Sequence, residues 1–312
     1  MLDLTRKRIL VTGGNGFLGS HIIKELRNVG VSEIISPSSK VCDLRKEENI
    51  ISLLKDEQPN VVIHCAAAVG GIGANRDNPG SFFYENLIMG TQLMEQSRLS
   101  NVEKFVAIGT ICCYPKITPV PFKEEELWSG YPDETTGYYG LAKKMLLVQS
   151  KAYRKQYGFN SIFLMPVNIY GPGDNFIGEH AHVIPALVKK FVDAKVNKSE
   201  EVICWGTGMA TREFIYADDC AKAIVMATER YNSSEPVNIG TGQEMPIKNL
   251  AEKIAECIGY SGKIVWDRTK PDGQPRRCLD VTRAKEQFGF EATTSFDDGI
   301  KRTVDWYSNN NL

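Results

Sequence analysis

The stretch "RILVTGGNGFLGS", residues 8–20, decides the fold of this chain. A short apolar run leads into three glycines spaced three apart, and a helical pattern follows them. Glycine permits a tight turn and a close approach of backbone to a pyrophosphate, and a helix N-terminus favours negative charge. The spacing therefore predicts a dinucleotide-binding turn. Its predicted cofactor contacts are Gly13, Asn15, Gly16, Phe17, Leu18 and Gly19.

The alternation of short apolar runs and helical patterns continues outward to about Gly171. Further strands are predicted in "EIISP" (33–37), "NVVIHCAA" (60–67), "KFVAIGT" (104–110) and "SIFLMPVNIYG" (161–171). Strands that alternate with helices favour a parallel sheet covered on both faces. The predicted fold class is α/β, a doubly wound parallel (Rossmann) sheet with a smaller C-terminal α/β substrate domain.

The same pattern suggests where the domains divide. Residues 1–170, with a returning segment near 214–242, are predicted to form the nucleotide-binding domain. Residues 171–213 and 243–312 are predicted to form the substrate domain, because their pattern of strands and helices is less regular.

Composition argues against several classes of protein. The formal net charge of -1 and the absence of a basic block give no footprint for nucleic acid. No apolar run approaches the roughly 18 residues of a membrane span. The N-terminus enters a strand directly, unlike a signal peptide. The eight scattered cysteines are expected to be reduced thiols of a cytoplasmic protein, and no paired Cys/His spacing suggests a metal site.

The end of the second predicted strand bears on the choice of cofactor. An NAD site usually carries an acid there, to hold the ribose 2′-hydroxyl. Here the strand ends in Ser38, Ser39 and Lys40, and hydroxyls with a cation suit a 2′-phosphate. NADP(H) is therefore the predicted cofactor, with Asp43 meeting the adenine amino group. A solvated turn is the alternative for this segment.

The segment "YYGLAKK", residues 138–144, supplies groups for reduction chemistry. Tyr139 and Lys143 are four apart on a predicted helix and share one face. An ammonium beside a phenol favours the phenolate, which makes the tyrosine a usable proton donor or acceptor. Thr110 ends the strand predicted over 104–110, at the sheet edge where ligands bind, so its hydroxyl is predicted to hold the substrate oxygen.

Together these features resemble the extended short-chain dehydrogenase/reductase superfamily and, within it, the GDP-L-fucose synthase family. The resemblance covers essentially the whole chain. The matching segments are "SSKVCDL", "AAAVGGIGAN", "GTICCYPK", "YYGLAKK", "PVNIYGPGDNF", "HVIPALVKK", "WGTGMATREFIYADD" and "KPDGQPRRCLDVTR".

The resemblance implies a Cys/His pair for epimerisation. Cys112 falls on the family's catalytic thiol, and the histidine of "HVIP" is His182. Inverting a centre beside a ketone requires one group that removes a proton and another that returns one to the opposite face. Alternatively, Cys112 is a thiol that packs in the core, and His182 caps a helix. Cys113, the next residue, is expected to point away and to pack.

The resemblance also implies the remaining contacts and the activity. The implied reaction is GDP-4-keto-6-deoxy-D-mannose to GDP-L-fucose, by epimerisation at C3 and C5 and NADPH-dependent reduction at C4. Lys190 stands where some members have Arg. The implied cofactor contacts are Ala66, Lys143, Pro166, Asn168 and His182, and the implied substrate contacts are Asn168, Lys190, Trp205, Arg212 and Arg277.

Three functions remain open at the level of sequence. The first is the family's own reaction. The second is a sister epimerase/reductase acting on a GDP-linked keto-heptose or dideoxy sugar. The third is a cofactor-sensing protein without catalysis, which the five catalytic groups argue against. The helices holding residues 82–98 and 138–158 are predicted to pair in a homodimer.

Overall fold

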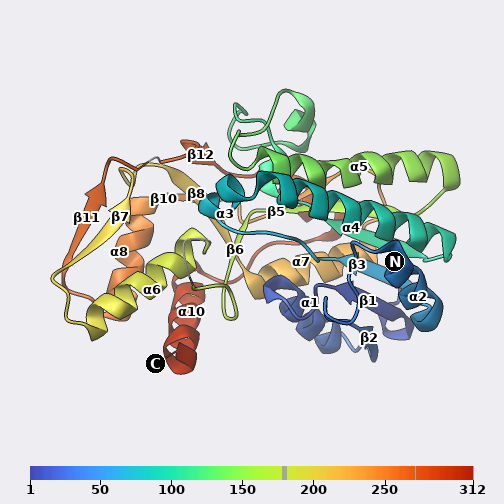
Figure 1. The fold of residues 1–312 in the computed structure, drawn as a ribbon, viewed down its shortest axis with the longest axis horizontal. Coiled ribbons are helices and arrows are strands. Elements are labelled where there is room, and N and C mark those ends of the chain that lie inside the picture. The colour runs from blue at the N-terminus through green and yellow to red at the C-terminus, as the bar shows by residue number, and fades with distance from the viewer. Residues whose placement is uncertain (178–180, 271, 312) are drawn as a thin grey trace.

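The structure, a computed structural model, describes residues 1–177, 181–270 and 272–311. Its centre is a parallel sheet in the order β2-β1-β3-β4-β5-β9. Figure 1 shows the whole fold, with β1, β2, β3 and β5 of this sheet labelled. The strands are β1 (Arg8–Thr12), β2 (Glu33–Ile35), β3 (Val61–His64), β4 (Lys104–Ile108), β5 (Ser161–Pro166) and β9 (Val237–Ile239). This arrangement confirms the predicted doubly wound fold.

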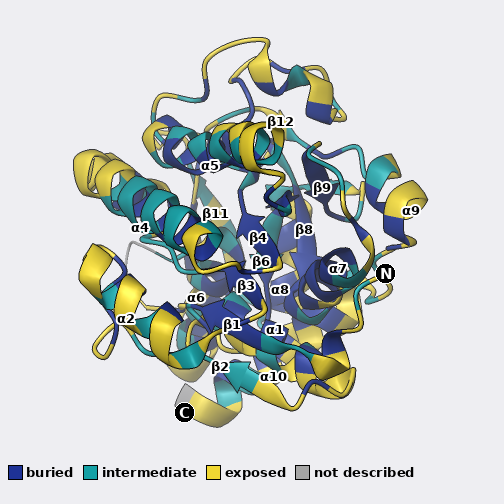
Figure 2. Cartoon of the chain, turned by 90° about the vertical axis from the view of Figure 1, so that its right-hand side faces the viewer, coloured by how far each residue is buried: buried dark blue, intermediate teal, exposed yellow. Residues whose placement is uncertain are grey.

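Helices cover both faces of this sheet (Figure 2). Helices α1 and α7 pack together on one face, and α2, α4 and α5 follow one another across the other. Strands buried on both faces read as continuous apolar runs, which is why β3 and β5 show no polar alternation. The helices are α1 (Phe17–Asn28), α2 (Glu47–Glu57), α4 (Pro79–Leu99), α5 (Gly137–Tyr157) and α7 (Ala217–Arg230).

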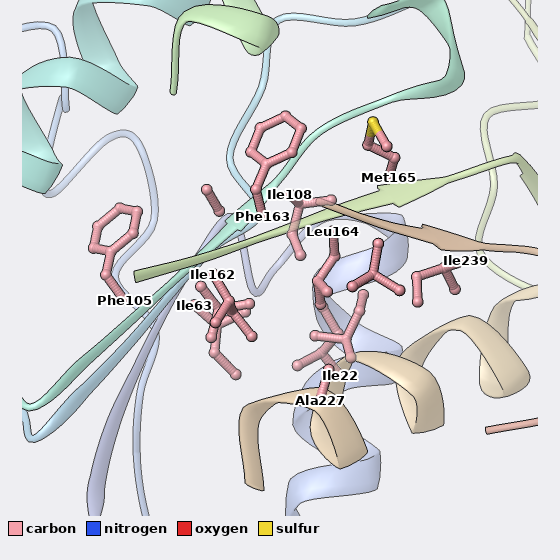
Figure 3. Close-up of a cluster of buried hydrophobic side chains, with 14 of the residues drawn as sticks. Ile22, Ile63, Phe105, Ile108, Ile162, Phe163, Leu164, Met165, Ala227 and Ile239 are labelled. Atoms are coloured by element: carbon pink, nitrogen blue, oxygen red, sulfur yellow. The ribbon is translucent and has the colours of Figure 1, made fainter. Parts of the chain in front are cut away.

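The core follows the alternation of side chains along the strands. On β5, Ile162 and Leu164 point toward α1 and α7, whereas Phe163 points to the opposite face (Figure 3). Ile22 of α1 and Ala227 of α7 close the first of these layers.

A smaller part is built on a second sheet in the order β10-β8-β12, with β6 also pairing with β8. A separate pair, β7 and β11, lies beside it, and three helices bury a second apolar core against these strands (Figure 1). The elements are β6 (Asn168–Tyr170), α6 (Val183–Val196), β7 (Glu201–Trp205), β8 (Thr211–Tyr216), β10 (Glu244–Pro246), α8 (Ile247–Ile258), β11 (Lys263–Asp267), β12 (Arg276–Arg277) and α10 (Phe296–Asn311).

The remaining helical elements are short. Helix α3 lies between β3 and α4, and α9 lies between β12 and α10. Three 3₁₀ turns complete the elements within the described ranges. The bounds are η1 (Leu4–Arg6), α3 (Ile72–Asp77), η2 (Ile111–Cys113), η3 (Glu124–Trp128) and α9 (Thr282–Phe288).

The structure differs from the predicted elements where the first part meets the second. The strand predicted over 161–171 is broken at Val167, so β5 lies in the large sheet and β6 in the small one. The sequence gives no sign of this switch, because both segments are largely apolar. Residues 279–290, predicted to lie in the substrate domain, contribute Leu279 and Phe288 to the core of the large sheet instead.

The predicted return of the chain near 214–242 corresponds to α7 and β9, which lie in the nucleotide-binding part. Lys104 of β4 ties this return to the sheet, since its buried ammonium donates to the carbonyls of Thr228 and Tyr231 at 2.6 Å each. The exact domain division stays a prediction. None of the helices in the described ranges combines the length and the apolar character that crossing a membrane requires.

Candidate active site

A cavity of about 1510 Å³ runs from the glycine turn after β1 to Trp205 at the end of β7. It follows the carboxyl edge of the large sheet, the edge where open α/β sheets bind ligands. Of the residues predicted for the site, all line this cavity except Lys40. The fold therefore brings together residues from the two sheets that lie far apart in sequence.

The glycine turn is shaped for close approach. Gly13 has φ +70°, and a Cβ there would lie 2.8 Å from the backbone of Ala66, two residues after β3. A Cβ on Gly19 would collide with the carbonyl of Gly13, so the first turn of α1 packs directly on the loop. Gly16 forms the N-cap of α1, and the first helical residues, Phe17 and Leu18, line the cavity. These features fit a dinucleotide diphosphate.

The turn after β2 contributes a different cation from the predicted one. Ser38 and Ser39 line the cavity, but Lys40 is exposed and lies outside its described wall. Arg45 lines the cavity instead, and it donates two hydrogen bonds of 2.9 Å to Asp43. These bonds hold the pKa of Asp43 at about 2. The signal that could have revealed Arg45 is its position two residues after Asp43.

The predicted reduction groups meet at the start of α5. The Tyr139 hydroxyl hydrogen-bonds the side chain of Thr110. Lys143, one turn further, is almost fully buried, and this burial lowers its pKa to about 8. The expectation that Lys143 lowers the phenol pKa is not met in this structure: burial raises the pKa of Tyr139. Tyr139 is therefore a neutral phenol that can donate a proton.

A glycine brings the predicted thiol beside this tyrosine. A Cβ on Gly140 would collide with the carbonyl of Cys112, so α5 can approach η2 only because residue 140 has no side chain. Thr110 caps η2 by accepting from the backbone N–H of Cys112 at 3.2 Å. Cys112 lines the cavity, whereas Cys113 is fully buried and its sulfur faces the Gly140 carbonyl at 3.3 Å. The packing role expected of Cys113 agrees with this position.

His182 lies at the N-cap of α6 and faces the cavity. Its ring makes no capping hydrogen bond to the helix, which removes the support for the cap alternative. Solvent reaches it through the cavity, yet the surrounding protein desolvates it and lowers its pKa. The imidazole is therefore neutral near neutral pH. His180, two residues before His182, lies outside the described residues.

The guanidinium groups of Arg212 and Arg277 line the same cavity as the Cys112 thiol. Burial, followed by the charge of Arg277, lowers the pKa of Arg212 to about 10. Arg212 is oriented by its own backbone neighbour, because Nη1 donates to the carbonyl of Thr211 at 2.7 Å. Two nearby guanidiniums repel each other unless an anion lies between them, and a diphosphate suits this arrangement.

Glu213 fixes the strands that carry these groups. In the structure it is fully buried and accepts from the backbone N–H groups of Thr241, Gly242 and Leu279 at 2.5, 2.8 and 2.6 Å. Its own carbonyl accepts from Nδ2 of Asn168 at 2.9 Å. One carboxylate thus joins β8, the loop after β9 and the segment after β12.

The far end of the cavity is aromatic and basic. The ammonium groups of Lys190 and Lys270 lie 5.9 and 5.3 Å from the ring centroid of Trp205. Lys190 also donates to the carbonyl of Ile203 at 3.0 Å, which holds it over β7. Trp205 remains half exposed, so its ring is accessible to a planar ligand.

A strand–glycine turn–helix, a Tyr/Lys pair and a threonine at the next strand end define a nucleotide-dependent enzyme of the epimerase/dehydratase type. The model of the "NAD dependent epimerase/dehydratase family" matches residues 9–240 of this chain.

Individual relatives narrow this class. The chain is 40% identical to GDP-L-fucose synthase 1 of Arabidopsis thaliana, over 97% of this chain and 94% of that protein. A GDP-6-OMe-4-keto-L-xylo-heptose reductase from C. jejuni superposes with a TM-score of 0.92 at 27% identity, covering 98% and 99% of the two chains. A GDP-L-fucose synthetase from Naegleria fowleri bound to NADP superposes with a TM-score of 0.91 at 28% sequence identity. The match covers 99% of this chain and 95% of that chain. The chain belongs to the GDP-L-fucose synthase family within the epimerase/dehydratase class.

Proposed function

We propose that this chain converts GDP-4-keto-6-deoxy-D-mannose to GDP-L-fucose, by epimerisation at C3 and C5 followed by NADPH-dependent reduction at C4. The observation that carries the proposal is that Thr110, Cys112, Tyr139, Lys143 and His182 all line one cavity. A protein that only sensed the cofactor would need the glycine turn and none of these five groups.

The residues of the glycine turn fit NADP(H). The cradle that Cβ atoms would fill at Gly13 and Gly19 suits the diphosphate. Ser38, Ser39 and Arg45 offer hydroxyls and a guanidinium for the 2′-phosphate. When bound, the reduced nicotinamide supplies the hydride for the reduction at C4.

Epimerisation requires two proton carriers. The protons at C3 and C5 are acidic because both carbons adjoin the C4 ketone. Cys112 and His182 both face the cavity, and we assign one to remove a proton and the other to return a proton on the opposite face. The enolate that forms between these steps develops negative charge on O4, where Tyr139 and Thr110 are assigned to donate hydrogen bonds.

Reduction uses the same ketone. Tyr139, held as a neutral phenol by burial, gives its proton to O4 as that oxygen becomes a hydroxyl. Lys143 below it provides the positive charge that stabilises the resulting phenolate. One arrangement at O4 therefore serves both reactions.

The rest of the cavity binds the nucleotide part of the substrate. Arg212 and Arg277 are assigned to the diphosphate, since they present two guanidiniums to one region. Trp205 is assigned to stack on the guanine, with Lys190 beside it. Asn168 at the start of β6 lies between the cofactor and sugar ends.

A sister reaction on a GDP-linked keto-heptose is the alternative, and the superposition on the C. jejuni heptose reductase favours it. The two reactions use the same nucleotide, so the sugar distinguishes them. We further propose that the protein is a cytoplasmic homodimer. The free thiols of the cysteines and the apolar residues exposed on α4 and α5 support this.

The first experiment is product analysis. The protein is incubated with GDP-4-keto-6-deoxy-D-mannose and NADPH, and the sugar is identified by NMR. GDP-L-fucose is the expected product. A reduced sugar that keeps its C3 and C5 configuration would overturn the roles of Cys112 and His182. No turnover, with NADPH still bound, would favour the heptose alternative.

A variant separates the two half-reactions. Cys112→Ser is expected to abolish deuterium incorporation at C3 and C5 from D₂O, because the serine hydroxyl is a far weaker base than a thiolate. NADPH binding, measured by fluorescence, is expected to be unchanged. Equal loss of both would show that Cys112 is structural.

A further inference from the structure

Arg277 contacts the thiol assigned to epimerisation. Its Nη1 lies 3.7 Å from Sγ of Cys112, within the range of an N–H···S hydrogen bond. Its Nε donates to Oε1 of Gln274 at 2.6 Å. Because a guanidinium is planar with its donors in a fixed fork, holding Nε also fixes the direction of Nη1. Gln274 therefore decides where Arg277 points.

Gln274 is anchored at its other end. Its Nε2 donates to the carbonyl of Lys116 at 2.8 Å. Lys116 follows Cys112 by four residues in the same segment. The contacts thus close a ring from Cys112 through Arg277 and Gln274 back to Lys116. The segment that carries the sulfur also orients the cation beside it.

We propose that Gln274 is a positioning residue, which aims the Arg277 guanidinium at Cys112 so that the thiolate form of this cysteine is stabilised. The inference rests on the proposed function, in which Cys112 and His182 handle a proton between them. A cation beside the sulfur favours the form in which the sulfur has released its proton. Arg277 then serves the chemistry as well as the diphosphate.

The other groups that act on the sulfur leave this effect in place. Tyr139 and Cys113 interact electrostatically with Cys112, but burial raises the pKa of both, to about 12 for Cys113, so both are neutral at neutral pH. Arg212 adds a second positive charge, although its Nη1 is turned to the Thr211 carbonyl. Asp133 and Asp272 act on Arg212 and oppose part of its effect, whereas Arg277 is in hydrogen-bond contact with the sulfur itself.

The test follows the alkylation of Cys112 by iodoacetamide as a function of pH, using the full chain and mass spectrometry of its peptide. In Gln274→Ala the alkylation rate at pH 7 is expected to fall about tenfold. The increase of this rate with pH is expected to occur at a higher pH than in the unmodified protein. The matched control is Gln243→Ala, whose exposed side chain lies outside the cavity wall, and its rate is expected to be unchanged.

A second variant guards against misfolding. Arg277→Lys keeps a positive charge but has no fork to hold Gln274 and the sulfur together, and it is also expected to slow alkylation. The proposal is overturned if either correctly folded variant is alkylated at the rate of the unmodified protein. A rise in KM for the GDP-sugar in that variant would then show that Arg277 serves only the diphosphate.

The alkylation assay contains no sugar, so its outcome is independent of the product analysis. If no epimerised product forms and Gln274→Ala still slows alkylation, the proposed function is wrong and the positioning of Arg277 stands. If the product is GDP-L-fucose and Gln274→Ala is alkylated at the normal rate, the proposed function stands and the positioning role of Gln274 is wrong.

Discussion

Lys143 illustrates a conflict between stability and function at a single residue. Its ammonium is buried, which lowers its pKa from 10.5 to about 8. Below about pH 8 both the folded and the unfolded protein carry this charge, and the folded state bears the desolvation penalty. Between about pH 8 and 10.5 the unfolded state binds the extra proton, so this penalty fades as pH rises.

Lys143→Met is therefore expected to stabilise the protein while abolishing reduction. At pH 7 the free energy of unfolding should rise by up to about 3 kcal/mol, from a pKa difference of about 2.5 units. The gain should shrink at pH 9.5, as measured by denaturant unfolding at both values. Lys155→Met, at an exposed position on the same helix, should show no such pH dependence. An equal gain in the free energy of unfolding at both pH values would contradict the lowered pKa of Lys143.

Tyr139 can be tested against its neighbour. Tyr139→Phe removes the proton donor and should lower the rate of NADPH oxidation by about 100-fold or more. Tyr138 lies on the same turn but is half exposed, so Tyr138→Phe should oxidise NADPH normally. The measurement is absorbance at the NADPH band under saturating substrate. Equal rates in both variants would remove Tyr139 from the mechanism.

Among the elements, the turn after β2 is expected to decide the choice of cofactor. Arg45 lines the cavity there and Lys40 does not. Arg45→Ala should therefore lower the ratio of kcat/KM for NADPH over NADH by about tenfold, since a charge-assisted contact to the 2′-phosphate is lost. Lys40→Ala should leave the ratio nearly unchanged. If the effects are reversed, the lysine predicted from sequence is the phosphate ligand.

The turn also shows which features the sequence can predict and which it cannot. Glycine spacing and apolar runs predict β1, α1 and the parallel sheet, because these depend on local geometry and on burial of both faces. The break at Val167 and the buried role of Glu213 depend on which distant strand pairs with which, and the local sequence carries no such information. Gln274 was missed for the same reason, since only the folded chain brings it to the cavity, whereas Arg45 had a local signal in its position two residues after Asp43.

At the level of the whole molecule, the exposed faces of α4 and α5 are expected to form the dimer interface. Tyr84 and Val148 are apolar residues exposed on these helices. Val148→Glu should shift the protein from dimer to monomer in sedimentation at micromolar concentration, because it places a charge in an apolar contact. Ile51→Glu, exposed on α2, should remain dimeric. A monomeric unmodified protein would contradict the proposed assembly.

The two departures of the chain from the large sheet have a consequence for protein engineering. The chain leaves at Val167, returns with α7 and β9, leaves again at β10 and returns near Leu279. Much of the smaller part, which we propose binds the sugar, therefore consists of two inserts in a core whose edge strand, β9, comes after the first insert. A fragment that stops at residue 170 would lack β9 and would leave Lys104 without its carbonyl partners. A chimera that borrows the sugar preference of a relative should exchange both inserts together and keep every strand of the core.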